Sequence, residues 1–105
     1  MSRSVTSRGA IQSTAVTVRP MDNEIYSGVQ ITFDEGSAST GTVVVSALVP
    51  GSDDDKAVSD STYTVGNNDG LTINNAALAG IVLTPDSVDA AMTYNVTFFG
   101  RHSAQ

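Results

Sequence analysis

Apolar and polar residues alternate along much of this chain with the period of two that is typical of β-strands. The alternation is strict over residues 29–33 and 92–98, which places every second side chain on one face of a half-buried strand. Residues 42–49 are largely apolar on both faces, as expected for a strand inside a sheet or one covered on its second face by another chain. The less regular segment 5–18, closed by Pro20, predicts one or two short strands.

Turn-forming residues separate the remaining apolar segments. Residues 67–70 read Asn-Asn-Asp-Gly, a signal that predicts a tight hairpin pairing Tyr63–Val65 with Leu71–Ile73. The segment Asn75–Gly80 combines a cap residue, small apolar residues and a terminal glycine, which predicts one helical turn or a corner. Residues 51–60 are expected to form a loop.

These short strands, without a long segment of helical period, predict an all-β fold. We expect a single antiparallel β-sandwich, Ig-like or a related Greek key, with a jelly roll as the alternative. A chain of 105 residues has the size of one domain. Within it, residues 1–20 are interpreted as a basic N-terminal arm with the first strand or strands, and residues 21–105 as the sandwich body.

Charge is scarce and unevenly distributed. Charged residues make up 15% of the chain and the net charge is −6, which argues against nucleic-acid binding because that binding needs clustered Lys and Arg. All eleven acidic residues lie between positions 22 and 89, whereas residues 1–20 hold three arginines and no acid. The arginines of this segment are Arg3, Arg8 and Arg19. The segment is either a solvated tail or an arm that docks on an acidic neighbour.

The sequence offers little for catalysis or cofactor binding. It has no cysteine, a single histidine, His102, and no Gly-x-Ser-x-Gly elbow, so we expect neither an enzyme nor a cofactor. Asp53, Asp55 and Asp60 form a weak candidate site for a hard cation such as Ca²⁺, but their spacing favours a solvated acidic loop. No apolar run is long enough to cross a membrane, and no secretory signal is expected.

A low-charge body rich in Ser, Thr, Val, Ala and Gly, without Cys or Trp, follows the basic arm and ends in the strand Tyr94–Gly100. In this style the whole chain resembles small virion proteins of tailed bacteriophages, in particular capsid decoration (cement) proteins. The resemblance implies a non-enzymatic protein of the virion, assembled in the host cytoplasm, that stabilises the head by bridging subunits. It implies the major capsid protein or other virion subunits as partners, and a homo-oligomer or many copies on the shell.

On this interpretation a small set of residues would contact the partner. Charged contacts come from the arginines of residues 1–20, and apolar contacts from Val5, Ile11 and Phe99. Phe99 falls on the opposite face of its strand from Phe98, so it is either covered by the N-terminal segment or exposed to another subunit. The alternative function is a surface- or carbohydrate-binding β-sandwich module of a fibre, tail or adhesin, which an exposed Tyr26 would favour.

Overall fold

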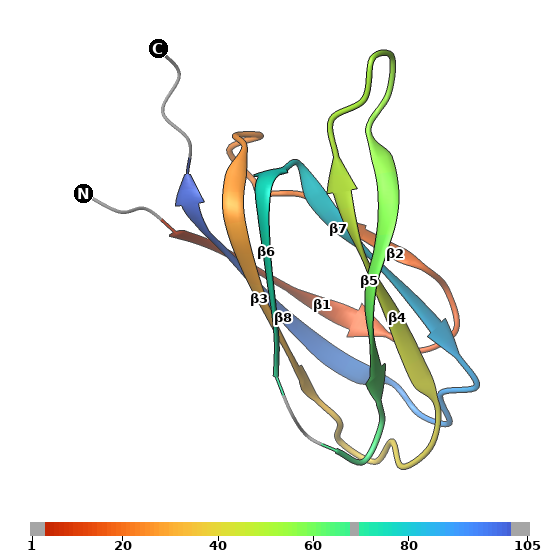
Figure 1. The fold of residues 1–105 in the computed structure, drawn as a ribbon. Helices are drawn as coiled ribbons and strands as arrows, with labels where there is room; N and C mark the ends of the chain where they lie inside the picture. Colours follow the sequence, from red (N-terminus) through yellow and green to blue (C-terminus); the bar gives the residue numbers. More distant parts are fainter. Residues whose placement is uncertain (1–3, 68–69, 102–105) are drawn as a thin grey trace.

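The computed structural model describes residues 4–67 and 70–101, and these form two antiparallel four-stranded sheets packed face to face (Figure 1). The strands are β1 (Ser4–Ile11), β2 (Val16–Val18), β3 (Tyr26–Asp34), β4 (Thr42–Val49), β5 (Lys56–Thr64), β6 (Leu71–Leu78), β7 (Gly80–Asp86) and β8 (Met92–Arg101). The sheet with the order β1-β8-β3-β6 is called sheet A below, and the sheet with the order β2-β7-β4-β5 is called sheet B. The predicted β-sandwich is therefore confirmed.

The strand order is that of a jelly roll. Strand β1 pairs with β8, β2 with β7, β3 with β6, and β4 with β5, so the chain behaves as one long antiparallel hairpin wound into two sheets. The alternative topology that the sequence left open is thus the observed one. The Ig-like arrangement is wrong, because that fold divides its strands between the two sheets in a different order.

Apolar side chains from both sheets meet between them and form the core. Alternation along each strand sends every second side chain inward, and these residues are buried. The core includes Tyr26, Val29, Ile31 and Phe33 of β3, Val43, Val45 and Ala47 of β4, Ile73 and Leu78 of β6, Ile81 and Leu83 of β7, and Met92, Val96 and Phe98 of β8. Aromatic rings join the layers: the ring of Phe33 in sheet A lies 4.5 Å from that of Tyr63 in sheet B, measured between centroids.

The strongest sequence patterns correspond to strands. Residues 29–33 lie in β3 and residues 92–98 in β8, and the segment 5–18 contains the two strands β1 and β2. Strand β4, over residues 42–49, lies between β7 and β5 in sheet B, and its inward residues Val43, Val45 and Ala47 belong to the core.

Two local predictions are wrong, and one alternative is settled. Tyr63–Val65 and Leu71–Ile73 do not pair, because β5 belongs to sheet B and β6 to sheet A, so the Asn-Asn-Asp-Gly signal lies in a connection between sheets. Asn68 and Asp69 themselves lie outside the described residues. No helical turn forms over residues 75–80: β6 of sheet A ends at Leu78 and β7 of sheet B begins at Gly80, so the segment is the corner that the sequence left as the alternative. Strand β5 begins at Lys56, inside the expected loop. In each case pairing with a distant strand overrides the local preference.

Within the ranges described above, no helix is long and apolar enough to cross a membrane.

Candidate docking surface on sheet A

Most side chains on the outer face of sheet A are polar and uncharged. Registers across β1, β8, β3 and β6 align these residues in rows that cross the sheet. The rows are Ser4, Phe99, Gly28 and Asn74; then Thr6, Thr97, Gln30 and Thr72; then Arg8, Asn95 and Thr32; then Ala10, Thr93 and Asp34. Apart from Gly28, these residues are exposed or half-buried, so hydroxyl and amide groups dominate what a partner would meet.

Two charged residues stand on this face among the neutral ones. Arg8 is exposed on β1 and faces Asn95 in the register with β8. Asp34 at the end of β3 accepts a hydrogen bond from the side-chain amide of Asn95 at 3.4 Å. Thr6 and Thr97 share a hydrogen bond of 3.0 Å between their hydroxyl oxygens. Side-chain hydrogen bonds on this face thus link β1 to β8 and β8 to β3. The face carries little net charge, in contrast to the acidic chain as a whole.

Phe99 supplies the one aromatic ring on this face. It is half-buried, and its ring lies against Gly28, where an added Cβ would overlap the ring atoms. The missing side chain at Gly28 therefore lets the ring lie close to the backbone of β3. The ring is held in place by the sheet, and its remaining exposed surface is available for contact.

The inner side of β1 is only partly covered by sheet B. Strand β2 pairs three residues with β7, whereas β1 pairs eight with β8. Val5 and Tyr94 pack against the core yet remain half-buried, and the Tyr94 ring occupies the space above Gly9 that a side chain there would fill. Apolar surface is therefore left beside β1.

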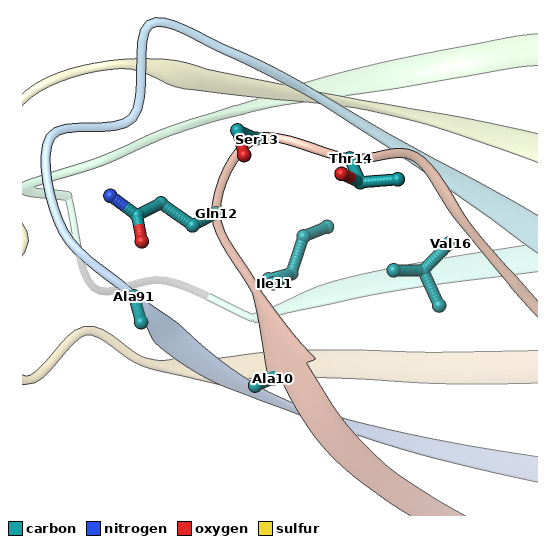
Figure 2. Close-up of a pocket in the computed structure, with 7 residues that line it drawn as sticks. All are labelled: Ala10, Ile11, Gln12, Ser13, Thr14, Val16 and Ala91. Carbon is teal, nitrogen blue, oxygen red and sulfur yellow. The ribbon is translucent and has the colours of Figure 1, made fainter.

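A pocket of about 290 Å³ opens where β1 ends (Figure 2). Its lining residues come from the end of β1, the β1–β2 loop and the residue before β8: Ala10, Ile11, Gln12, Ser13, Thr14, Val16 and Ala91. Figure 2 shows Ile11 and Val16 on the inner side of the loop that carries Gln12, Ser13 and Thr14. The wall of the pocket is apolar, its rim is polar, and its lining holds no ionisable group.

The structure brings only part of the predicted contact set together. Arg8 on β1 and Phe99 on β8 share the outer face of sheet A, where these two strands are hydrogen-bonded neighbours. Val5 points to the inner side of β1, and Ile11 is buried in the core with 3% of its surface exposed. Arg3 lies outside the described residues.

Arg19 belongs to a different part of the molecule. It follows β2 in sheet B, and its guanidinium Nη1 lies 2.7 Å from Oδ2 of Asp55. Asp55 therefore forms an ion pair with Arg19. Within the described ranges the structure contains no group of three His, Cys, Asp or Glu residues that could hold a metal ion. The candidate cation site of Asp53, Asp55 and Asp60 is not assembled.

Two other carboxylates accept hydrogen bonds from buried tyrosine hydroxyls. Asp22 accepts a hydrogen bond of 2.6 Å from the hydroxyl of Tyr26, and Glu35 accepts one from the hydroxyl of Tyr63. Tyr26 is fully buried, so the exposed ring that would have favoured the adhesin or fibre alternative is not present at this position.

Asp89 clamps the β3–β4 loop. Its carboxylate accepts hydrogen bonds from the backbone N–H of Ser39 at 2.8 Å, the Ser39 hydroxyl at 2.7 Å and the Thr40 N–H at 3.1 Å. These bonds, above all the one from the Ser39 N–H, lower the pKa of Asp89 to about 2 because they stabilise the ionised form.

Sequence reasoning missed Gly9, Gly28 and the pocket. The signal for the first two was present, since a glycine inside a strand marks the close approach of another group. The pocket depends on the path of the β1–β2 loop past β8, which no local pattern encodes.

Comparison with known proteins finds similar folds but assigns the chain to no family. No protein-family model and no curated protein matches the sequence. Among solved structures, the chain is similar to that of Bacillus endospore appendages, which form disulfide-linked pili, with a TM-score of 0.57, 12% identity and coverage of 98% of this chain and 88% of that one. It is also similar to the SPBc2 prophage-derived protein YomS, with a TM-score of 0.56, 12% identity and coverage of 91% and 96%.

A third similar structure is the Yersinia pseudotuberculosis-derived mitogen, with a TM-score of 0.54, 9% identity and coverage of 100% of this chain and 91% of that one. At these identities the three likenesses show a shared β-sandwich. They carry no residue roles across to this chain.

Proposed function

We propose that this protein is a non-enzymatic structural protein of a virion, a capsid decoration (cement) protein that stabilises the head of a tailed phage by bridging its subunits. The observation that carries the proposal is the outer face of sheet A, which presents Arg8 and Phe99 on one nearly neutral, hydrogen-bonding surface. The fold is in keeping with it, since a pilus structure and a prophage-derived protein are among those similar to this chain.

The chemistry of this face suits a neutral or weakly acidic shell surface. Threonine hydroxyls and amides form hydrogen bonds with any polar backbone or side chain, so the face would adapt to a repeated protein surface. The Phe99 ring would provide the main apolar contact of the interface, because aromatic residues contribute disproportionately to binding. Arg8 would pair with a carboxylate of the shell for about 1 kcal/mol or less, since an exposed ion pair is screened by water.

Stabilisation of the shell then follows from mass action. A protein that binds only the assembled shell lowers the free energy of that state relative to dispersed subunits. Each contact needs only modest affinity, since many copies act on the same shell. The partners on this proposal are the major capsid protein or other virion subunits, and the protein resides in the virion after assembly in the host cytoplasm.

Co-sedimentation with phage heads tests the proposed face. Removal of residues 1–12 is a poor test, because it would delete all of β1 and the buried Ile11. Arg8→Glu and Phe99→Ala change the face by one side chain each, and Lys56→Glu makes the matched charge reversal on β5 of sheet B. The proposal predicts that the full chain and Lys56→Glu sediment with the heads of candidate tailed phages, whereas Arg8→Glu and Phe99→Ala bind at least about tenfold more weakly.

Variants are first compared with the unchanged protein by far-UV circular dichroism, so that loss of binding is not confused with unfolding. Equal binding by all four proteins would overturn the assignment of this face. Failure of the full chain to sediment with any head would overturn the cement function itself.

A further inference from the structure

The free edge of β1 differs from the other three sheet edges. A strand edge exposes unpaired N–H and C=O groups, and proteins usually block such edges with bulges, charges or short strands. At the β5 edge, Asp60 forms a bulge opposite Val45 and Ser46, and Lys56 begins the strand. The β6 edge is irregular opposite Tyr26 and Gly28, and β2 is only three residues long.

Strand β1 has neither a bulge nor a short length. It runs in unbroken register with β8 through eight consecutive pairs, from Ser4 with Phe99 to Ile11 with Met92. It contains no proline and no acidic residue, and its one charge is Arg8. An edge of this length and regularity is a template for a further strand.

We propose that two copies of this chain associate through their β1 strands across a two-fold axis, so that the two A sheets join into one eight-stranded antiparallel sheet. A symmetric pair of this kind is self-complementary and closes after two copies, whereas a head-to-tail contact would generate rings or fibres. The inference does not depend on the proposed cement function, since it concerns the free protein.

The pleat and the charges select one register. A two-fold axis that passed between two neighbouring residues of β1 would place inner side chains of one copy opposite outer side chains of the other. The axis must therefore pass through a residue of β1. Centred on Arg8, it would place two guanidinium groups opposite each other, which destabilises a strand pair. Centred on Thr6, it would pair only residues 4–8. Centred on Ser7, it pairs residues 4–10 and sets each Arg8 opposite the Thr6 of the other copy.

The same register fits the uncovered surface beside β1. On the inner side, Val5 of each copy lies opposite Gly9 of the other, where the Tyr94 ring fills the space above the glycine. Val5 and Tyr94 are the half-buried apolar residues that the short β2 leaves partly uncovered. An aromatic and a β-branched side chain brought together across paired strands stabilise that pairing.

On the outer side, the pairing joins two copies of the docking face. One face of four strands, each about eight residues long, covers roughly 500 Å², which is less than the roughly 800 Å² per partner of a standard interface. Two faces side by side reach about 1,000 Å² and carry two copies of Arg8 and Phe99. Self-association would therefore turn a small contact surface into one of ordinary size.

Because the chain has no cysteine, single thiols can test the register directly. Ser7→Cys places one thiol at the proposed axis, and Ser59→Cys places one on the β5 edge as the matched control. Under mild oxidation or with a short bis-maleimide, Ser7→Cys should form most of its material as a covalent dimer on a denaturing gel, and Ser59→Cys only a trace. Opposed residues across paired strands lie close enough for either bond.

Ser4→Cys mixed with Ala10→Cys tests the offset, because the Ser7 axis sets these two positions opposite each other. Cross-linking should appear in the mixture and not in either variant alone. Sedimentation equilibrium of the unchanged chain should show a monomer–dimer equilibrium that does not proceed to larger species. Monomer at every concentration, or equal cross-linking of Ser7→Cys and Ser59→Cys, would overturn the proposal; cross-linking of Ser4→Cys alone would overturn the register.

Discussion

The contact between Tyr63 and Glu35 should contribute measurably to stability because it joins the two sheets. Tyr63, on β5 of sheet B, is 2% exposed and donates its hydroxyl hydrogen bond to Glu35, which follows β3 of sheet A. The same carboxylate oxygen accepts the Gly66 N–H at 2.8 Å. Tyr63→Phe keeps the ring that packs against Phe33 and removes only the hydroxyl, so the change isolates the hydrogen bond.

A hydrogen bond to a charged group contributes about 1.5–3 kcal/mol, and we expect Tyr63→Phe to lower the free energy of unfolding by about this amount. For a domain of this size the loss corresponds to roughly 6–20 °C in Tm. Urea unfolding followed by far-UV circular dichroism measures it, with an unchanged m value as evidence that the unfolded state is unaffected.

Tyr94→Phe is the matched control, since the structure shows no hydrogen bond from the Tyr94 hydroxyl to the described residues. This variant should lower the free energy of unfolding by no more than about 0.5 kcal/mol. In a Glu35→Gln background the loss caused by Tyr63→Phe should shrink, because its charged acceptor is gone. Equal losses for Tyr63→Phe and Tyr94→Phe would refute the argument.

Two further predictions concern the loops at one end of the sandwich. Asp89 has its pKa lowered from 3.8 to about 2, so its contribution to stability is complete above pH 3.8 and is lost as the pH falls toward 2. Between pH 4 and pH 2, the free energy of unfolding measured with urea should therefore fall less steeply for Asp89→Asn than for the unchanged protein. Parallel curves of unfolding free energy against pH would show that the hydrogen bonds from Ser39 to Asp89 do not stabilise the fold. Gly41 has φ +115°, and an added Cβ would lie 2.6 Å from the backbone Cα of Val88. Gly41→Ala should lower the free energy of unfolding by about 2 kcal/mol or more in the same assay. Gly36→Ala, with φ +59° and an added Cβ at an ordinary contact distance of 3.7 Å from the Ala91 carbonyl oxygen, should lower it less; the reverse order would be inconsistent with the packing.

Local patterns were enough to predict strands and faces. The alternation over residues 29–33 and 92–98 placed the core-facing side chains correctly, because a period of two is a property of the strand itself. It also placed Phe99 on the face opposite Phe98. What could not be predicted is which strands pair, since pairing depends on residues far apart in the sequence.

Two segments illustrate that limit. The turn signal at residues 67–70 marks a change of direction but not the sheet that the chain enters next, so it was interpreted as a hairpin instead of a crossing between sheets. Residues 75–77 are Asn-Ala-Ala, a poor strand sequence by propensity, yet they lie within β6 because Asn74 and Leu78 on either side of them pair with β3. Arg8 and Phe99 come onto one surface only because β1 pairs with β8, a contact that spans almost the whole chain.

The central claim, that this protein stabilises a phage shell, is tested most directly by the heat resistance of heads. Heads of the phage to which the protein binds are prepared without it, heated with increasing amounts of the pure chain, and assayed for release of packaged DNA. A cement protein raises the temperature of release in a saturable manner, and Arg8→Glu requires a higher concentration for the same effect. Unchanged release at saturating, demonstrably bound protein would contradict the account.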